Sequence, residues 1–212
     1  MTAAIDHERG AAVTYAIAKR ALDVLLASCA LIVLAPLLAI IAMLVWLDDP
    51  GAPVLYRQRR CGRGGRCFDL LKFRTMVRDA DDLKEALRER SVVGWPDFRL
   101  PDDPRVTRVG RPLRRSSLDE LPQLVNVLRG EMSLVGPRPT SFDATTYALW
   151  QTGRLDFRPG ITGPWQVYGR NRMDFTQRCR LEISFFRRRS LPSELWLLVR
   201  TLPCIIRRTG VA

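Results

Sequence analysis

The sequence predicts an α+β fold in which one membrane-inserted helix leads into a small globular domain. A charge-free apolar run extends from Val24 to Leu47, and it is longer than the ~20 residues that a membrane-spanning helix needs. Two extended segments then flank a turn with glycines at 62, 64 and 65, as in a β-hairpin. The C-terminal part alternates apolar and arginine-rich stretches with a helical period, which is typical of amphipathic interfacial helices.

These patterns divide the 212 residues into three segments. Residues 1–18 form a polar N-terminal segment without predicted order at its start, residues 19–48 form the membrane helix, and residues 49–212 form the globular domain with its interfacial helices. The apolar run is too long for the core of a signal peptide. We therefore expect the helix to be retained in the membrane.

Composition narrows the function classes. The chain has 34 Lys and Arg against 22 Asp and Glu, a formal charge of +12, and arginine is suited to bidentate recognition of phosphate. Such a balance indicates nucleic acid, a membrane surface or an anionic substrate as partner. The single histidine, His7, excludes histidine triads and multi-histidine zinc sites. The five cysteines are scattered, which argues against a disulfide framework and favours a reducing compartment.

The membrane helix has two interpretations that the residues leave open. Pro36 lies in the middle of the apolar run, where it removes a backbone hydrogen bond. Basic residues flank the run on both sides, Lys19 and Arg20 before it and Arg57 after it, so the charge bias gives no orientation. A straight helix would span the bilayer, whereas a helix broken at Pro36 would return to the same face. At the start of this helix, Asp23 is expected to pair with Arg20.

The globular domain is predicted to begin with a hairpin and to end with broken helices. Its expected elements are strands at 54–57 and 67–73, a charged helix at 79–90, a loop at 94–104, a strand at 132–135, a short helix at 142–150, a loop at 158–165 and helical pieces over 174–208. Pro192 and Pro203 are expected to break the last stretch into pieces too short to span a membrane.

Two adjacent carboxylates, Asp119 and Glu120, are the candidate catalytic residues. Ser117 stands three positions before Glu120, the spacing of a capping box, which places both acids in the first turn of a helix. Five arginines precede the pair: Arg105, Arg108, Arg111, Arg114 and Arg115. Arginines beside carboxylates keep them ionised. Together they make a pocket for phosphates and a divalent metal. Locally, however, an acidic first turn is also an ordinary helix start.

Several motifs in the same order resemble the bacterial sugar transferases that act on polyprenyl phosphate, the monotopic phosphoglycosyl transferases. The resemblance covers almost the whole chain. It is carried by the residues at 19–23, 72–76, 103–107, 117–123, 132–139, 159–163 and 166–170, which read KRALD, KFRTM, DPRVT, SLDELPQ, MSLVGPRP, PGITG and QVYGR.

This resemblance implies a reaction and a site. Members of the family move a sugar 1-phosphate from a UDP-sugar to undecaprenyl phosphate and release UMP. Asp119 would be the nucleophile that forms a phosphosugar-aspartyl intermediate, and Asp119 and Glu120 would bind Mg²⁺. The substrate-binding residues would be Arg105, Arg114, Pro137, Arg138, Pro139 and Arg170. A re-entrant helix broken at Pro36 would hold a minimal catalytic form on the cytoplasmic face of the inner membrane, among its lipids, where the product begins a surface or exopolysaccharide glycan.

Some positions depart from the common family pattern, among them Ala35 where some members have serine and Glu182 where aspartate is common. The segment at 164–167 resembles that of hexose-1-phosphate enzymes more than that of N-acetylhexosamine enzymes. Neither the sugar nor pairing of the chain as a homodimer is determined by the sequence. The alternatives are a transferase that moves the sugar alone and releases UDP, a non-enzymatic membrane-tethered binder of polyanions, and a scaffold with a degenerate site. Nucleic acid is not expected as a partner, because no aromatic residues are interleaved with the arginine cluster.

Overall fold

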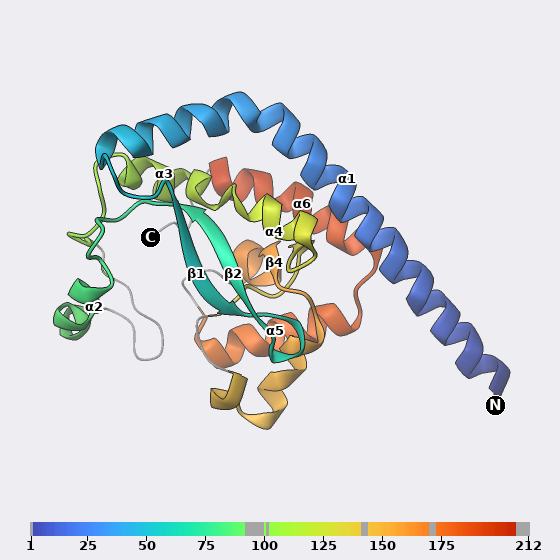
Figure 1. Cartoon of the computed structure of the whole chain (residues 1–212). Coiled ribbons are helices and arrows are strands. Elements are labelled where there is room, and N and C mark those ends of the chain that lie inside the picture. Colours follow the sequence, from blue (N-terminus) through green and yellow to red (C-terminus); the bar gives the residue numbers. More distant parts are fainter. Residues whose placement is uncertain (1, 92–99, 101, 141–143, 170–172, 207–212) are drawn as a thin grey trace.

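In the computed structural model, a long helix arches over a small domain of mixed helix and sheet (Figure 1). The structure describes residues 2–91, 100, 102–140, 144–169 and 173–206. The α-helices are α1 (Thr2–Asp48), α2 (Asp82–Ala86), α3 (Gly110–Ser116), α4 (Gln123–Arg129), α5 (Phe175–Arg187) and α6 (Leu191–Ile206). The strands are β1 (Leu55–Cys61), β2 (Cys67–Phe73), β3 (Ser133–Val135) and β4 (Gly160–Thr162). The predicted combination of a long apolar helix with a small mixed domain is confirmed.

Helix α1 corrects one sequence-based expectation. The helix begins at Thr2, so it extends through the N-terminal segment as well as the segment at 19–48 that was expected to enter the membrane. Pro36 lies inside this continuous helix, so the predicted break is wrong at the level of secondary structure. The ribbon instead curves along the top of the arch (Figure 1). A bend relieves the clash of the proline ring with the preceding turn while the flanking hydrogen bonds persist.

The first half of α1 is fixed to the domain by a buried polar cluster. Lys19, and not Arg20, forms the ion pair with Asp23, which is 2% exposed. The Asp23 carboxylate also accepts a hydrogen bond from the backbone N–H of Leu134 at 3.1 Å. Arg20 instead donates to the carbonyl groups of residues 127 and 128 at the end of α4. The expected Asp23–Arg20 pair is therefore wrong, because both side chains find tertiary partners.

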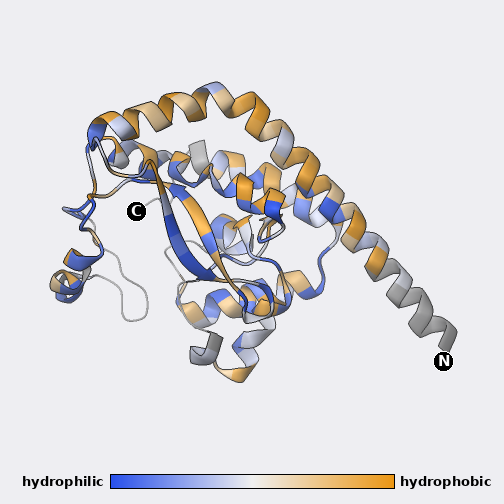
Figure 2. Ribbon diagram, viewed as in Figure 1, coloured by the Kyte–Doolittle hydropathy of each residue, from blue (hydrophilic) through white to orange (hydrophobic). Residues whose placement is uncertain are grey.

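The second half of α1 packs on another part of the same domain. Ile41 and Val45 are buried with Phe73 of β2 and Leu113 of α3. Between the two halves, the apolar side chains of Ile32 and Val33 are 74% and 76% exposed. The stretch Val13–Asp48 is long and apolar enough to cross a membrane by length and composition, and Figure 2 shows the hydrophobic colour along the arch.

The predicted hairpin is confirmed. Strands β1 and β2 pair antiparallel, with Leu55 opposite Phe73 and Cys61 opposite Cys67. The turn between them needs the glycine at 64, whose φ is +63°. One strand is hydrophilic and the other largely hydrophobic (Figure 2). Leu70, Leu71 and Phe73 of β2 are buried in the core, whereas the residues of β1 are mostly exposed or half-buried. Strand β1 is therefore the one on the solvent side.

A second small sheet joins two of the sequence motifs. The predicted strand at 132–135 appears as β3, and the segment expected as a loop at 158–165 contains its parallel partner, β4. The backbones touch at two glycines: a Cβ on Gly136 would lie 2.2 Å from the carbonyl oxygen of Arg158, and one on Gly160 would lie 2.0 Å from the backbone nitrogen of Gly136. Glycine is required at both positions because any side chain would collide with backbone.

The remaining elements are shorter or longer than predicted. The charged helix expected at 79–90 is only α2 followed by a 3₁₀ turn at Arg88–Arg90. Residues 141–143, in the short helix expected at 142–150, lie outside the described residues, and 3₁₀ helices follow at Ala144–Thr146 and Leu149–Asp156. The expected break at Pro203 is wrong, since this proline lies inside α6. Pro192 is tolerated because it occupies the first turn of α6, where its missing N–H needs no partner.

Candidate active site

The two candidate carboxylates lie between two helices, on a single 3₁₀ turn that spans Leu118–Glu120. The expected capping box is wrong. Ser117 has left-handed backbone angles, with φ 58° and ψ 18°, and its side chain makes no capping hydrogen bond. Ser117 ends α3 rather than beginning α4, so the chain reverses there. This reversal, and not a cap, sets the direction in which Asp119 and Glu120 project.

This geometry predicts that Ser117→Gly stabilises the fold by about 0.5–1 kcal/mol, because glycine adopts a positive φ without the steric cost that a Cβ brings. The measurement is urea unfolding of the detergent-solubilised protein. Ser116→Gly is the matched control, since Ser116 is still helical in α3 and glycine there should destabilise by about 0.5–1 kcal/mol. If both variants destabilise equally, the left-handed conformation of Ser117 is not a source of strain.

Glu120 is held by two cations that come from distant parts of the chain. Its Oε1 accepts from Lys72 Nζ of β2 at 3.0 Å and from Arg138 Nη2 at 2.7 Å. Its Oε2 lies 3.4 Å from Arg138 Nη1, so the guanidinium group faces both oxygens. The result is a compact charged centre of one carboxylate and two cations beside Asp119.

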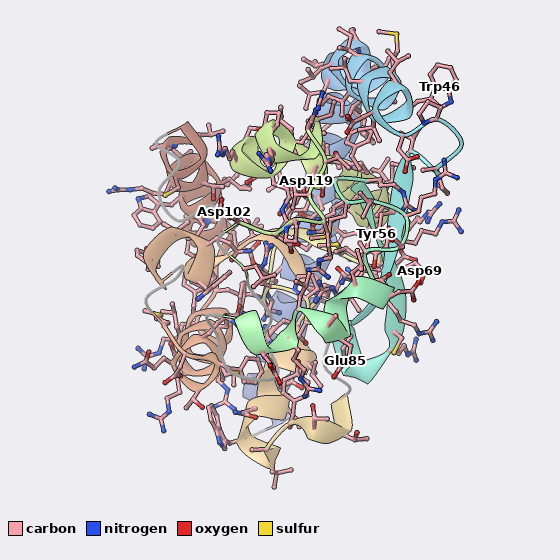
Figure 3. The ribbon with its side chains drawn as sticks, turned by 90° about the vertical axis from the view of Figure 1, so that its left-hand side faces the viewer. Trp46, Tyr56, Asp69, Glu85, Asp102 and Asp119 are labelled. Atoms are coloured by element: carbon pink, nitrogen blue, oxygen red, sulfur yellow. The ribbon has the colours of Figure 1, made fainter. Side chains whose placement is uncertain are left out.

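Asp119 has a different environment from its neighbour. It is 7% exposed and lies inside the molecule, whereas Asp69 points outward from the hairpin (Figure 3). Among the described residues, no hydrogen bond or ion pair engages the Asp119 carboxylate. Burial raises the pKa of Asp119 to about 6, against the opposing charge of Lys72, and the negative charge of Glu120 adds to the rise.

The cations therefore do not hold the pKa of Asp119 down as expected, although with a pKa of about 6 the carboxyl group is still mostly ionised at neutral pH. The charges of Arg114 and Arg138 do lower its pKa, but loss of hydration outweighs them. For Glu120 the balance is opposite: burial would raise its pKa, but Arg138 and Lys72 outweigh burial and hold the pKa below its usual range. Two adjacent carboxyl groups thus have pKa values pushed apart, which suits them to different chemical roles. The permanently charged Glu120 is a poor proton acceptor and a good anchor for cations.

Arg138 is positioned by a buried ion pair that sequence reasoning did not connect to the site. Its backbone N–H donates to Glu182 Oε1 at 3.0 Å, and its carbonyl oxygen accepts from Arg154 Nη2 at 2.7 Å. Arg154 and Glu182 bind each other at 2.6 Å and are 3% and 0% exposed. Glu182 on α5 and Arg154 therefore clamp the backbone of Arg138 from both sides, and this fixes the direction of its side chain toward Glu120.

The other predicted site residues fall into separate groups. Pro137 and Pro139 flank Arg138, and the carbonyl oxygen of Pro137 accepts from the N–H of Gly160 at 2.9 Å. Arg114 acts on Asp119 through its charge. Arg105 is 4% exposed and is bound to Asp103 and to a backbone carbonyl.

The structure therefore gives Arg105 a role in holding its loop, and substrate binding by this residue stays a prediction. Arg170 lies outside the described residues.

Lys72 is the central residue to which the sequence analysis gave no role. It belongs to one of the motifs, and it is one of only three lysines in the chain. In a protein that uses arginine almost everywhere else, a lysine inside a motif was the signal that could have identified it. Its partner is 48 positions away, so no local pattern could supply the pairing.

The donor set can be compared with the needs of Mg²⁺. This ion is usually held by one or two carboxylates together with substrate phosphates and water. The unengaged carboxylate of Asp119 fits that pattern, while both oxygens of Glu120 already accept from cations. The described residues contain no cluster of three or more side chains of the metal-binding types. The fit is therefore to an ion shared with a phosphate-bearing ligand.

Comparisons with known proteins give a consistent result. Residues 14–208 match the sequence profile of the family described as bacterial sugar transferase. The chain is 41% identical over 199 residues to the exopolysaccharide production protein ExoY of Sinorhizobium fredii, which covers 92% of this chain and 88% of the relative.

Two further relatives carry names that state a reaction. The undecaprenyl-phosphate galactose phosphotransferase of Salmonella typhimurium is 40% identical over 91% of this chain and 41% of its own length. The UDP-glucose:undecaprenyl-phosphate glucose-1-phosphate transferase of Caulobacter vibrioides is 41% identical over 89% of this chain and 69% of its own length. The chain thus spans most of some relatives and less than half of others.

Proposed function

The chain belongs to the bacterial sugar transferase family, and from this premise we propose that it transfers a sugar 1-phosphate from a UDP-sugar to undecaprenyl phosphate with release of UMP. The names of the relatives from Salmonella and Caulobacter support this reaction. They also favour a hexose such as glucose or galactose as the sugar. The name of the Sinorhizobium relative supports a role at the start of exopolysaccharide assembly.

The observation that carries the proposal is the Asp119 carboxylate, which is buried, has no partner among the described residues and lies beside a cationic centre. In the first step, an Asp119 oxygen attacks the sugar-bearing phosphorus of the donor. The bond from this phosphorus to the bridging oxygen breaks, and UMP leaves with the bonding electrons. In the second step, an oxygen of undecaprenyl phosphate attacks the same phosphorus and Asp119 leaves as a free carboxylate.

The surrounding residues reduce the repulsion between the anionic nucleophile and the anionic donor. Lys72 and Arg138 face the acid pair with fixed positive charge, and Arg114 adds a further charge. Glu120 holds the two cations in place. Mg²⁺, held by Asp119 together with the diphosphate of the donor, would neutralise charge on the leaving group. A covalent intermediate allows a soluble donor and a membrane-bound acceptor to use one site in turn.

The two attachment points of α1 support a re-entrant placement. Residues of its first half bind β3, and residues of its second half pack on β2 and α3. Since both halves are fixed to one domain, the exposed apolar middle enters the bilayer and returns to the same face. Cytoplasmic UDP-sugars then reach the domain from the cytoplasmic side of the inner membrane. The exposed apolar residues of α6 would lie in the interface: Leu195, Trp196, Val199 and Leu202.

The raised pKa of Asp119 predicts the pH dependence of UMP release. Only the ionised carboxylate is a nucleophile, so release should fall about tenfold per pH unit below pH 6, the value to which burial raises the pKa of Asp119. Lys72 is the strongest charge that lowers this pKa. Lys72→Met should therefore shift the acidic limb to higher pH, in addition to reducing the rate. Lys84→Met, on α2, is the control. An unshifted limb in Lys72→Met contradicts Asp119 as the titrating group.

The test of the reaction is nucleotide release from a panel of UDP-sugars by detergent-purified protein with undecaprenyl phosphate and Mg²⁺. UMP with one sugar supports the proposal and identifies the donor. UDP would indicate transfer of the sugar alone. No nucleotide with any sugar would favour the scaffold or the polyanion binder. Addition of EDTA separately tests the metal, and full activity without divalent cations would contradict the assignment of Mg²⁺.

A further inference from the structure

Outside the acid pair, a groove of about 850 Å³ runs along the first half of α1. Its apolar wall is formed by residues of α1 between Val13 and Leu25. Three arginines also line it, and they come from three separate parts of the chain: Arg20 of α1, Arg63 of the hairpin turn and Arg158 before β4. The groove is therefore amphipathic, with an apolar wall and a group of like charges.

The charges in this groove lack compensation from the protein. Arg20 donates to two carbonyl groups of α4, but no described residue forms a hydrogen bond or ion pair with the guanidinium groups of Arg63 and Arg158. The nearby carboxylate of Asp23 is already engaged by Lys19 and by a backbone N–H. Burial lowers the pKa of Arg158, and the charges of Arg20 and Arg63 lower it further. An anion in the groove would relieve this repulsion.

We propose that this groove binds a phospholipid with an anionic headgroup, its phosphate between Arg63 and Arg158 and an acyl chain along Ile17 and Leu25 of α1. The apolar wall favours a lipid over a free anion, because it offers burial that phosphate alone cannot use. A second copy of this chain fits less well, since each copy carries a formal charge of +12. This inference rests on the proposed membrane placement of α1 and not on the transfer reaction.

The groove and the acid pair lie at different ends of the hairpin. Arg63 lies in the turn, next to the pair Cys61 and Cys67, whereas Lys72 pairs with Tyr56 near the open end. Lys72 lies five positions along β2 from Cys67, which is roughly 17 Å at about 3.3 Å per residue. The Arg63 end of the groove therefore lies well away from Lys72, one of the two cations that hold Glu120. The lipid in the groove anchors the domain and is not the acceptor.

The experiment titrates detergent-solubilised protein with short-chain phosphatidylglycerol and follows binding by native mass spectrometry. Arg63→Gln/Arg158→Gln is compared with Arg57→Gln/Arg59→Gln, which removes two exposed arginines of β1 and thus the same charge. We expect saturable binding that the groove variant weakens at least tenfold, while the β1 variant weakens it less than threefold. Ile17→Asn, an uncharged change at a residue that is 66% exposed, should also weaken binding of the lipid.

Several results would overturn the inference. Equal losses in the two double variants would mean non-specific attraction by net charge. If inorganic phosphate competes as well as the lipid does, the groove is a site for free phosphate. If phosphatidylcholine binds as tightly as phosphatidylglycerol, the groove does not recognise the charge of the headgroup. Preferential displacement by undecaprenyl phosphate would mean an acceptor site. UMP release from the donor is measured on the same variants, so that this inference is tested separately from the proposed reaction. If the unmodified chain releases no UMP but binds the lipid, only the proposed reaction is contradicted.

Discussion

Replacement of Asp119 by asparagine is expected to abolish UMP release, with a loss of at least about 10³-fold, because an amide cannot form the phosphosugar-aspartyl intermediate. The measurement is UMP release in a single turnover with the UDP-sugar that the unmodified protein uses. Trapping of radiolabelled sugar phosphate on the protein should be lost at the same time. A variant that still releases UMP would contradict the assignment of Asp119 as nucleophile.

The same substitution is expected to stabilise the fold. Burial raises the pKa of Asp119 from its ordinary value of 3.8 to about 6, so the folded protein retains a proton that the unfolded chain releases. The stability that the protonated carboxyl contributes is complete below pH 4 and is lost as the pH rises from about 4 to 6. Above pH 6 the buried charge is a cost. Asp119→Asn removes this cost and should add on the order of 1–3 kcal/mol at neutral pH.

Glu120→Gln is the matched control, because its expected effect has the opposite sign. The pKa of Glu120 is held down by Arg138 and Lys72 against the effect of burial, so its charge contributes stability that is present above its ordinary pKa and lost in acid. Its loss should destabilise the fold by about 1–3 kcal/mol at neutral pH. Urea unfolding at pH 4 and pH 7.5 measures both. If Asp119→Asn destabilises at pH 7.5, the account of its burial is wrong.

Glu182→Gln is expected to cause the largest loss of stability, about 3–5 kcal/mol, because it leaves the guanidinium group of Arg154 buried without a counter-charge. Both side chains of this pair are almost fully buried, at 3% and 0% exposure. The pair of Arg78 and Asp49 at the surface is the control, and Arg78→Gln should have little effect on stability because solvent screens the pair. A loss for Glu182→Gln no larger than that of the control would mean that the buried pair is open to water.

The double variant Arg154→Met/Glu182→Met separates stability from positioning. It removes both charges, so much of the lost stability should return. It also removes the two groups that hold the backbone of Arg138. UMP release should therefore remain about 10-fold or more below that of the unmodified protein, as for other losses of a transition-state interaction. Recovery of both stability and activity would show that the clamp has no role in placing Arg138.

Much of the architecture follows from local sequence pattern. The return strand of the hairpin, the apolar run of α1 and strand β3 were predictable because each depends on neighbours within a few positions, where period and turn residues are visible. The acid pair was identified for the same reason, as two carboxylates in a motif. The prediction of a capping box at Ser117 was wrong although the spacing of the residues fits one, because Ser117 has a positive φ and ends α3.

Tertiary structure alone decided the electrostatics of the site. Lys72 and Arg138 reach Glu120 from 48 and 18 positions away, and the pair Arg154 and Glu182 meets across 28 positions. Burial raises the pKa of Asp119 against the effect of its cationic neighbours. Burial is a property of the packed domain and cannot be predicted from the residues next to Asp119 in the sequence. The sequence by itself thus determined the candidate catalytic residues, and the fold determined their charge and direction, because hydration and long-range pairing exist only after packing.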